Sequence, residues 1–376
     1  MTVRQKELCE KLEQTDGRPL RSVVGLDGFV DEVVHVVDKR YSPTEFDRIL
    51  TLRAYGNRIS DSSGLSSNVE IVTIDKKLGG NGPIFALGLK KFCADITYIG
   101  CVGADSHDAV FAELVNGSRV IGICEPGRTD AMEFEDGKLI RSKIDMFNNM
   151  TWQNILKKIP EEEFARLLDE ARLLSFNNWT MINAMSDIWK HILKDILPLM
   201  KSPLEEKILF FDIADPEKRE EKDITEALSL IREFNNSGFH TILGLNKKEA
   251  CEIAAIAGTE YSDYAGADLK ELTERVAGYL SIECVVVHPA DRAACVKDGL
   301  YHEVEGPYCA RPNLTTGAGD NFNAGFVYGY AMSLDMDLCL LLGTATSGFY
   351  VRERGNPTLP EVREFLGKWG AGLLDQ

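Results

Sequence analysis

From about residue 151 onward, short apolar segments alternate with long amphipathic ones. The apolar segments cover residues 173–176, 208–213, 241–245 and 284–288. Between them, residues 216–235 and 265–280 place apolar side chains at the spacing of one helix face. Strands separated by such helices join through right-handed crossovers into a mostly parallel sheet. The alternation therefore predicts a three-layer α/β fold around a mostly parallel central sheet.

The first part of the chain has a different pattern. Residues 1–17 have the charge pattern of a short amphipathic helix, so we assign 1–20 to an N-terminal helical extension and 21–376 to one domain. Alternation typical of strands appears at 68–76 and in a hairpin around Asp136 and Gly137. We expect residues 32–76 and 128–146 to form a small β lid, with 41–67 as polar loop and lid material.

Charge and composition exclude several classes of protein. Against 42 basic residues the chain has 59 acidic ones, a formal charge of −17, which opposes general binding to nucleic acid or to an anionic membrane. The nine cysteines are scattered, without the spacing of a zinc site or a CxxC motif. The chain has no signal-like N-terminus and no apolar run of about 18 residues. The sequence thus predicts a cytoplasmic protein whose partners are small molecules.

One segment concentrates the chemistry. In LTTGAGDNFNAGF, which starts at Leu314, Gly317, Ala318 and Gly319 directly precede an apolar helix. Backbone amides at such a helix start favour an anion, and Asp320 would lie beside them as a proton acceptor. The alternative is that Asp320 only caps the helix and the glycines only make a turn. The helix terminus would also hold the pKa of Asp320 low.

Three further motifs precede this one. Gly79 and Gly80, followed by Asn81, lie between a strand and a helix, and their bare backbone would let a ligand approach closely. Asn246 and Glu249 directly follow a strand with the spacing of a helix capping box. An early strand leads into Asp27 and Asp31, whose carboxylates could each accept two hydroxyl groups or only make a turn.

In this order, the four motifs resemble those of the ribokinase-like (PfkB) carbohydrate kinases, from about residue 23 to residue 365. The last segment is similar to the family's second signature at Thr315, at the Gly317 to Asp320 stretch, and at Phe322 and Gly325. The resemblance implies a ribokinase-like fold. It also implies ATP as phosphate donor and a sugar-like hydroxyl acceptor, with Asp320 as the catalytic base.

The resemblance also implies roles for the other motifs. The amides of Gly317, Ala318 and Gly319 would form an anion hole, and Thr315 would contact the nucleotide. Asn246 and Glu249 would organise Mg²⁺ beside the nucleotide, partly through water. On the acceptor side, Asp31, or alternatively Asp27, would bind the sugar, with Gly79, Gly80 and Asn81 beside it.

Two positions depart from the family pattern. Leu314 replaces an Asp that helps form a monovalent-cation site in some members, so potassium dependence stays open. After the strand at 284–287, HPADRA replaces the family's Thr-x-Gly-x-x-Gly, and Arg292 keeps a basic residue near the expected phosphates. In addition, Ile84 stands where the family often has Asn, and Asn81 is an alternative source of that hydrogen bond.

The sequence therefore predicts a carbohydrate kinase that uses ATP and Mg²⁺. A proton would pass to Asp320 late in a loose transition state, so a weak base would suffice. Two alternatives stay open: a nucleoside kinase of the same fold, and a sugar-sensing homologue with little catalysis. A homodimer through the lid is a further possibility that the family resemblance raises.

Overall fold

The computed structural model describes residues 1–14 and 19–374. Within them, nine strands form a central sheet in the order β14-β13-β12-β11-β10-β9-β1-β5-β6. The strands are β1 (Arg21–Leu26), β5 (Asp95–Gly100), β6 (Arg119–Gly122), β9 (Leu173–Phe176), β10 (Ile208–Asp212), β11 (His240–Leu245), β12 (Cys284–Val287), β13 (Arg292–Lys297) and β14 (Leu300–Glu305). The pairs from β6 through β12 are parallel, and β13 and β14 add an antiparallel edge. The mostly parallel sheet that the sequence predicts is confirmed.

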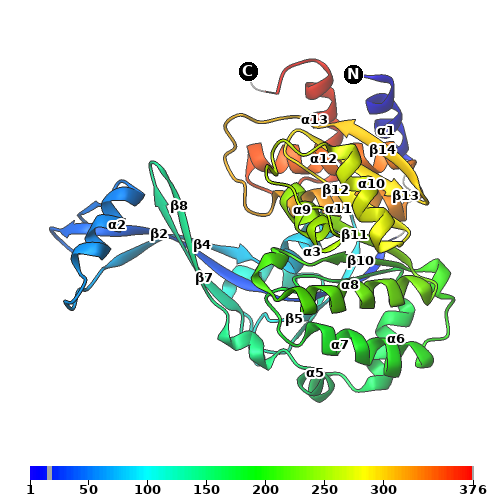
Figure 1. The fold of residues 1–376 in the computed structure, drawn as a ribbon, viewed down its shortest axis with the longest axis horizontal. Helices are drawn as coiled ribbons and strands as arrows, with labels where there is room; N and C mark the ends of the chain where they lie inside the picture. The colour runs from blue at the N-terminus through cyan, green and yellow to red at the C-terminus, as the bar shows by residue number, and fades with distance from the viewer. Residues whose placement is uncertain (15–18, 375–376) are drawn as a thin grey trace.

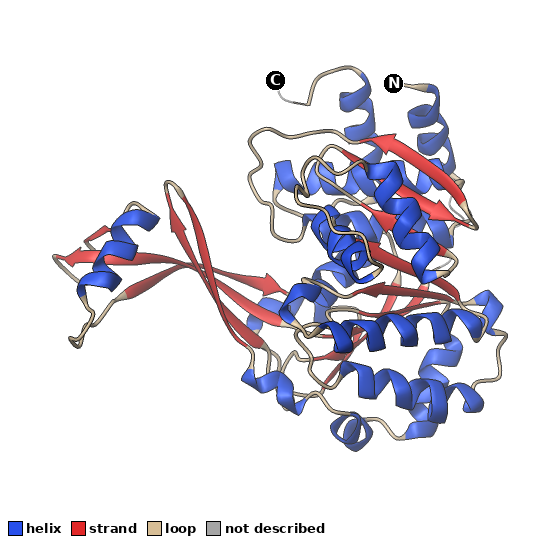
Figure 2. Ribbon diagram, viewed as in Figure 1, coloured by secondary structure: helices blue, strands red, loops and turns tan. Residues whose placement is uncertain are grey.

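Helices cover both faces of this sheet (Figures 1 and 2). One face carries α5 (Trp152–Lys158), α6 (Glu161–Glu170), α7 (Met185–His191), α8 (Glu221–Asn236), α9 (Lys247–Ile256) and α10 (Leu269–Leu280). The other carries α1 (Val3–Glu13), α3 (Asn81–Lys91), α4 (Ala112–Val115), α11 (Ala318–Ala331), α12 (Met336–Glu353) and α13 (Leu359–Gly370).

Strand β10 shows why both faces are covered. Its side chains alternate between the two faces, as those of any strand do, and all are apolar except the last. Phe211 packs against Phe234 of α8 with ring centroids 5.6 Å apart, whereas Phe210 stacks on Phe85 of α3 at 5.1 Å. A strand that is apolar on both sides is stable only between two helical layers.

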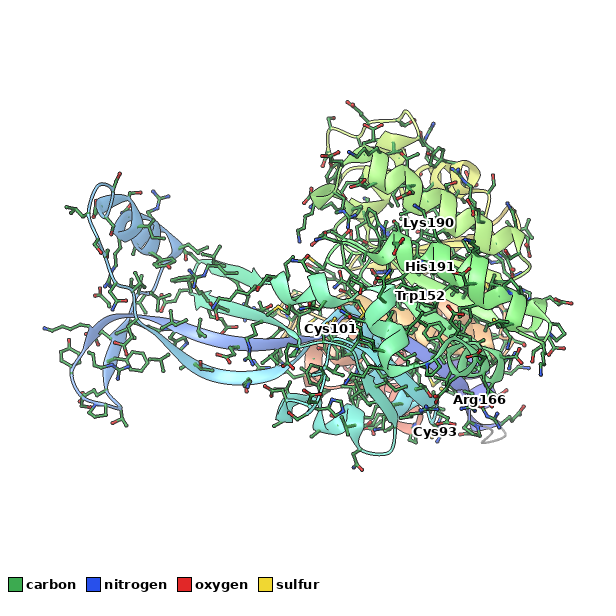
Figure 3. All side chains as sticks on the ribbon, turned by 90° about the horizontal axis from the view of Figure 1, so that it is seen from below. Cys93, Cys101, Trp152, Arg166, Lys190 and His191 are labelled. Atoms are coloured by element: carbon green, nitrogen blue, oxygen red, sulfur yellow. The ribbon has the colours of Figure 1, made fainter. Side chains whose placement is uncertain are left out.

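The helical layers are densely filled with aromatic side chains. On the first face, Trp152 of α5 lies parallel to the His191 ring of α7, with centroids 5.2 Å apart (Figure 3). Two helices start later than the sequence pattern predicts. Residues 216–218 form a short 3₁₀ turn before α8, and α10 starts at Leu269 because the Asp268 side chain caps it by accepting from the Glu271 N–H at 2.8 Å.

A second, smaller sheet forms the lid, which projects away from the body of the molecule (Figures 1 and 3). Its strands are β2 (Phe29–Arg40), β3 (Phe46–Arg48), β4 (Ile71–Gly79), β7 (Gly127–Phe134) and β8 (Gly137–Lys143). Strands β7 and β8 are the predicted hairpin. The lid crosses into the body where β2 follows β1 and where β4 leads into α3.

The expectation of a polar loop at 41–67 is wrong in part. This segment contains β3 and helix α2 (Leu52–Asp61) near the outer end of the lid. The helix is anchored by Tyr55, whose ring stacks on Phe134 of β7 at 5.6 Å. Thr51 caps its start by accepting from the Ala54 N–H. A single buried aromatic residue in a polar segment leaves little periodic signal, which is why the sequence pattern missed the helix.

The carboxyl ends of the parallel strands meet at one edge of the sheet. Four of them lead directly into polar residues: β1 into Asp27, β9 into Asn177 and Asn178, β11 into Asn246 and β12 into His288. Ligands of open α/β sheets bind at this edge. Among the described helices, none is both long and apolar enough to cross a membrane.

Candidate active site

The start of α11 forms a concave backbone surface at this edge, which we call the anion nest (the amides of residues 317–320). Gly317 adopts a left-handed conformation with φ of 92°, which turns the chain into the helix. The Ala318 N–H donates to the Thr315 carbonyl at 3.1 Å. The amides of Gly317, Gly319 and Asp320 have no hydrogen bond among the described residues, so they remain available to an anion. Three amides are thus free, and the amide of Asp320 takes the place of that of Ala318.

Side chains close in around both glycines of the nest. A Cβ on Gly317 would lie 2.7 Å from the Tyr350 hydroxyl oxygen and 3.0 Å from Cδ1 of Ile84. A Cβ on Gly319 would lie 3.1 Å from Cε1 of His288. These contacts hold the backbone of the nest in place.

Asp320 lies at the third position of α11 and is only 8% exposed. Burial, followed by the negative charges of Asp212 and Asp27, holds the pKa of Asp320 well above its ordinary value. The expectation of a low pKa is therefore wrong. The helix terminus favours the carboxylate, but desolvation and two acidic neighbours outweigh it. A nearby Asn81 amide acts in the opposite direction and lowers the pKa.

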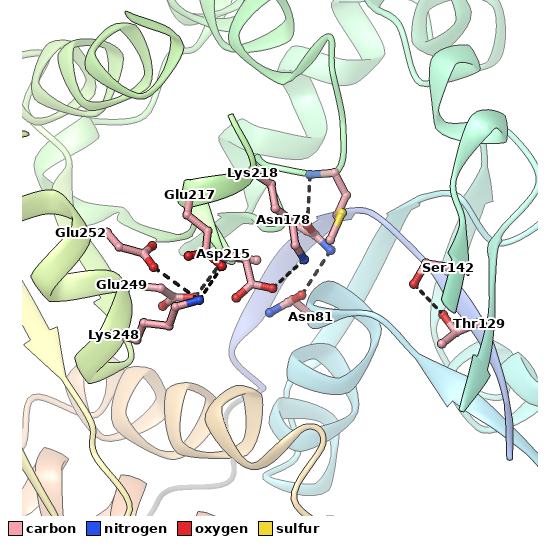
Figure 4. A network of polar contacts seen from close by, with 12 residues as sticks. Asn81, Thr129, Ser142, Asn178, Asp215, Glu217, Lys218, Lys248, Glu249 and Glu252 are labelled. Carbon is pink, nitrogen blue, oxygen red and sulfur yellow. Dashed lines mark hydrogen bonds and ion pairs between the residues drawn. The ribbon is translucent and has the colours of Figure 1, made fainter. Parts of the chain in front are cut away.

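Asn81 links several of these groups (Figure 4). Its Nδ2 donates to Oδ2 of Asp212 at 3.4 Å, and its Oδ1 accepts from Nδ2 of Asn178 at 3.2 Å. Asn178 also donates to Asp27 at 2.8 Å. Asp212, the last residue of β10, additionally accepts from Asn323 of α11 at 3.1 Å. A continuous amide and carboxylate network therefore forms the floor of the site.

Asp27 is fully buried, and both of its oxygens are occupied. Oδ2 accepts from the Asn81 N–H and from Asn178, and Oδ1 accepts from the Gly82 N–H at 2.9 Å. Burial raises the pKa of Asp27 to about 6, against the effect of these donors. Gly80 has φ of 99°, and a Cβ there would lie 2.8 Å from Oδ2 of Asp27. Asp27 and Gly80 thus fix the start of α3 and leave no free oxygen for a sugar.

Asp31 lies in a different environment, on lid strand β2. Its carboxylate packs over the bare backbone of Gly79, where a Cβ would lie 2.3 Å from Oδ2. Burial raises the pKa of Asp31, and a hydrogen bond from Thr129 lowers it. Burial, then Asp320 and Asp31, raise the pKa of Tyr350, so its hydroxyl lies within electrostatic range of both carboxylates. Asp31 therefore faces the same side of the molecule as Asp320.

Asn246 and Glu249 form the capping box of α9. Oδ1 of Asn246 accepts from the Glu249 N–H at 2.9 Å, and Glu249 accepts from the N–H groups of Asn246 and Asp215 at 2.8 and 3.0 Å. Burial raises the pKa of Glu249. Burial is also the largest cause of the raised pKa of Asp212, and the negative charge of Glu249 is the second cause. The charge of one of these carboxylates raises the pKa of the other, and a hydrated Mg²⁺ would offset that repulsion.

The described residues contain no group of three or more acidic, histidine or cysteine side chains placed to ligate a metal directly. Mg²⁺ keeps several of its waters and needs only one or two protein carboxylates, which Asp212 and Glu249 would supply. The residues present therefore fit a water-mediated magnesium site.

A cleft of about 440 Å³ joins these groups. It is lined by nine of the residues that the sequence singles out: Asn81, Asn246, Glu249, Arg292, Thr315, Gly317, Ala318, Gly319 and Asp320. Asp27, Asp31, Gly79 and Gly80 do not line it and lie beside it on the lid side. Arg292 is at the exposed rim, where it pairs with Asp291 and Glu303 at 3.2 Å.

Several polar residues of the site carry no motif in the sequence. Asp212 and His288 line the cleft, while Asn178 and Asn323 lie in the floor. The signal that could have found three of them is their position, at or just beyond the carboxyl end of β9, β10 or β12.

Next to the nest, the backbone carbonyls of Thr316, Val351 and Arg352 accept hydrogen bonds from other residues of the protein. The Val351 carbonyl accepts from the N–H groups of Asn313 and Leu314 at 2.8 and 3.3 Å. The Tyr350 hydroxyl donates to the Thr316 carbonyl at 3.0 Å, and the Asn313 side chain donates to the Arg352 carbonyl. Each of these three carbonyls therefore already accepts at least one hydrogen bond from the protein.

The fold and this site define a ribokinase-like carbohydrate kinase, and comparisons with known proteins agree. Ribokinase from Thermotoga maritima superposes with a TM-score of 0.61 at 17% identity, covering 93% of this chain and 100% of that chain. Arabidopsis thaliana ribokinase, solved with ribose and ATP, gives 0.62 at 16%, covering 93% and 98%. A nucleoside kinase from Methanocaldococcus jannaschii gives 0.58 at 15%, covering 94% and 99%. Identities this low establish the shared fold alone.

The chain belongs to the prokaryotic ketohexokinase family, whose model matches residues 2–369. A ketohexokinase from Haloferax volcanii is 27% identical over 378 residues, covering 100% of this chain and 97% of that protein. An uncharacterized sugar kinase from Archaeoglobus fulgidus is 34% identical over 76 residues, which are 20% of this chain and 30% of that protein.

Proposed function

We propose that this kinase transfers the γ-phosphate of ATP to a hydroxyl group of a ketohexose, with Asp320 as the general base. The observation that carries the proposal is the position of Asp320. Its carboxylate is buried beside the three free amides at the start of α11 and lines the cleft. A hydroxyl group held against this carboxylate would face a phosphate held by the amides. That is the arrangement that in-line phosphoryl transfer requires.

The raised pKa of Asp320 makes it a better proton acceptor than an ordinary aspartate. The carboxylate must be ionised to accept a proton, and repulsion from Asp212 opposes ionisation. Asn246, Glu249 and Asp212 would hold Mg²⁺ through water, where the ion neutralises charge on the phosphates and on these acids. Asp320 would then be an ionised base when the substrates are bound, and neutral more often when they are absent.

Asp31, rather than Asp27, is the proposed sugar ligand. Asp27 has no free oxygen, whereas Asp31 is half-buried on the lid and faces the Asp320 side. Its carboxylate would accept hydrogen bonds from two adjacent sugar hydroxyls. Gly79 and Asn81 border this position, and the amide of Asn81 is close enough to Asp320 to orient it. Gly80 acts indirectly, by setting the start of α3.

We further propose that catalysis needs no monovalent cation. The carbonyls of Thr316, Val351 and Arg352 are already hydrogen-bonded to protein donors, and Leu314 supplies no carboxylate. An ion there would have to break these bonds before it could bind.

We also propose that the protein is cytoplasmic and that it forms a homodimer through the lid. Ile71 and Ile74 of β4 and Leu139 and Ile140 of β8 expose between 37% and 53% of their surface. They lie on the outer strands of the lid, which projects from the body. Exposed aliphatic residues on edge strands favour association with a second chain.

A substrate panel with a coupled readout of ADP formation tests the proposed function. The panel contains a ketohexose such as fructose, an aldohexose such as glucose, a pentose such as ribose, and adenosine. We expect the highest kcat/KM with the ketohexose. Preferential turnover of adenosine would favour a nucleoside kinase. Sugar binding in a thermal-shift assay without any phosphorylated product would favour a sensor.

A further inference from the structure

His288 occupies a position in the cleft that no role described above accounts for. It directly follows β12, and its N–H donates to the Leu245 carbonyl at 3.0 Å. Its side chain lines the cleft opposite the start of α11. The ring lies against Gly319, with Cε1 3.1 Å from the place of a Cβ, and against the Phe322 ring, with centroids 4.7 Å apart at 32°. Two consecutive turns of α11 therefore hold the imidazole over the anion nest.

The imidazole is neutral and has hydrogen-bonding capacity to spare. Burial lowers the pKa of His288 to about 4, so the ring carries one N–H donor and one acceptor nitrogen at neutral pH. Neither ring nitrogen is hydrogen-bonded to another described residue. The ring is half-buried and lines the cleft, so a ligand bound there can accept a hydrogen bond from its N–H.

We propose that His288 is a phosphate ligand, whose ring N–H donates to a non-bridging oxygen of the nucleotide's β- or γ-phosphate above Gly319. This inference rests on the proposed function, because it needs a nucleotide in the nest. It adds a neutral side-chain donor to the three free amides. Because the Ala318 amide is already occupied, a side-chain donor beside Gly319 adds directly to the donors of the nest.

The charged groups of the cleft favour this assignment. Asp212, Glu249 and Asp320 are acids and repel a polyphosphate, while Arg292 is paired with Asp291 and Glu303 at the rim. His288 can donate without adding negative charge.

A bound phosphate would also change the protonation of the ring. Negative charge within hydrogen-bonding distance favours imidazolium, so nucleotide binding should raise the pKa of His288 from its low value in the free protein. Binding in mildly acidic solution would then take up protons. A histidine that only packs against Phe322 would show no such linkage.

Three variants separate hydrogen bonding from packing. His288→Phe keeps a ring on Phe322 and Gly319 but has no donor, His288→Gln keeps a side-chain N–H, and His288→Ala has neither. We expect kcat/KM for ATP to fall by about 10² in the Phe and Ala variants, the usual loss for one donor to a reacting oxyanion. The Gln variant should recover to within about tenfold of the wild type. The melting temperature and the KM for sugar serve as controls for folding.

Calorimetry of Mg-ADP binding gives an independent readout. At about pH 6, wild-type protein measured in two buffers of different ionisation heat should take up more protons than the Gln variant, because the imidazole can gain a proton and the Gln amide cannot. Wild-type kcat/KM in the Phe variant, or equal proton uptake in wild type and Gln variant, would overturn the inference. Failure of the wild-type protein to bind any nucleotide would instead contradict the proposed function, and with it this inference.

Discussion

Gly317 is the position where the addition of a single methyl group should most reduce stability and activity. Its φ of 92° lies in the left-handed region, and an added Cβ would meet the Tyr350 oxygen at 2.7 Å and Cδ1 of Ile84 at 3.0 Å. In Gly317→Ala the methyl group must displace one of these neighbours. Displacing Tyr350 breaks its 3.0 Å bond to the Thr316 carbonyl, and the nest amides shift with that loop.

The expected loss of stability has three parts. The left-handed conformation costs alanine about 1–2 kcal/mol. Reduced freedom of the unfolded chain returns about 0.4–1 kcal/mol. Crowding against Tyr350 and Ile84 adds about 1–3 kcal/mol. The free energy of unfolding should therefore fall by about 1–5 kcal/mol, and displaced nest amides should lower kcat by about 10²-fold or more.

Two other glycines provide matched controls. Gly258 has φ of 87° and no atom within 4 Å of an added Cβ, so Gly258→Ala isolates the backbone cost. Gly278 lies inside α10, also in open space and without a positive φ, so its alanine variant should be neutral or stabilising. Denaturant unfolding and steady-state kinetics of all three variants check this. A Gly317→Ala enzyme that matches Gly258→Ala in both measurements would refute the crowding at the nest.

Three more predictions follow from the same contacts. In Asp212→Asn, one acidic neighbour of Asp320 is lost, the pKa of Asp320 falls, and the acid limb of the kcat/KM profile should move to lower pH; a shift to higher pH would contradict this electrostatic coupling. In Tyr350→Phe, the bond to Thr316 is lost, which should cost about 0.5–1.5 kcal/mol of stability. Potassium should then activate the variant but not the wild type. Equal activation of both would contradict the proposal that wild-type catalysis needs no monovalent cation. In Ile140→Glu, a charge enters the exposed aliphatic surface of the lid, and sedimentation should show a shift from dimer to monomer, whereas an unchanged dimer would place the interface elsewhere.

The sequence predicted those parts of the protein that are encoded locally. Strands β9 to β12 and their helices were recognisable because each is apolar at a regular spacing. Asp320, Asn246 and Glu249 were recognisable because each stands at a helix start in a motif of fixed spacing. Helix α2 was not, since Tyr55 is its one buried residue and only the half-buried Leu52 joins it in the small core of the lid.

The remaining parts of the site depend on contacts between distant segments. Asn178 reaches Asp27 across 151 residues of sequence, and Asp212 meets Asn323 across 111. The pKa of Asp320 was expected to be low because local sequence shows only the helix terminus. Its acidic neighbours, Asp212 and Asp27, arrive from strand ends elsewhere in the sheet. No local pattern carries that information.

The role of Asp320 is tested most directly by Asp320→Asn, which removes the base and keeps the shape of the side chain. We expect kcat for sugar phosphorylation to fall by about 10²–10⁴. Nucleotide affinity should not weaken, because the nest amides stay in place and a repelling charge is lost. A variant that turns over at close to the wild-type rate, with unchanged nucleotide binding, would contradict the assignment of Asp320 as the general base.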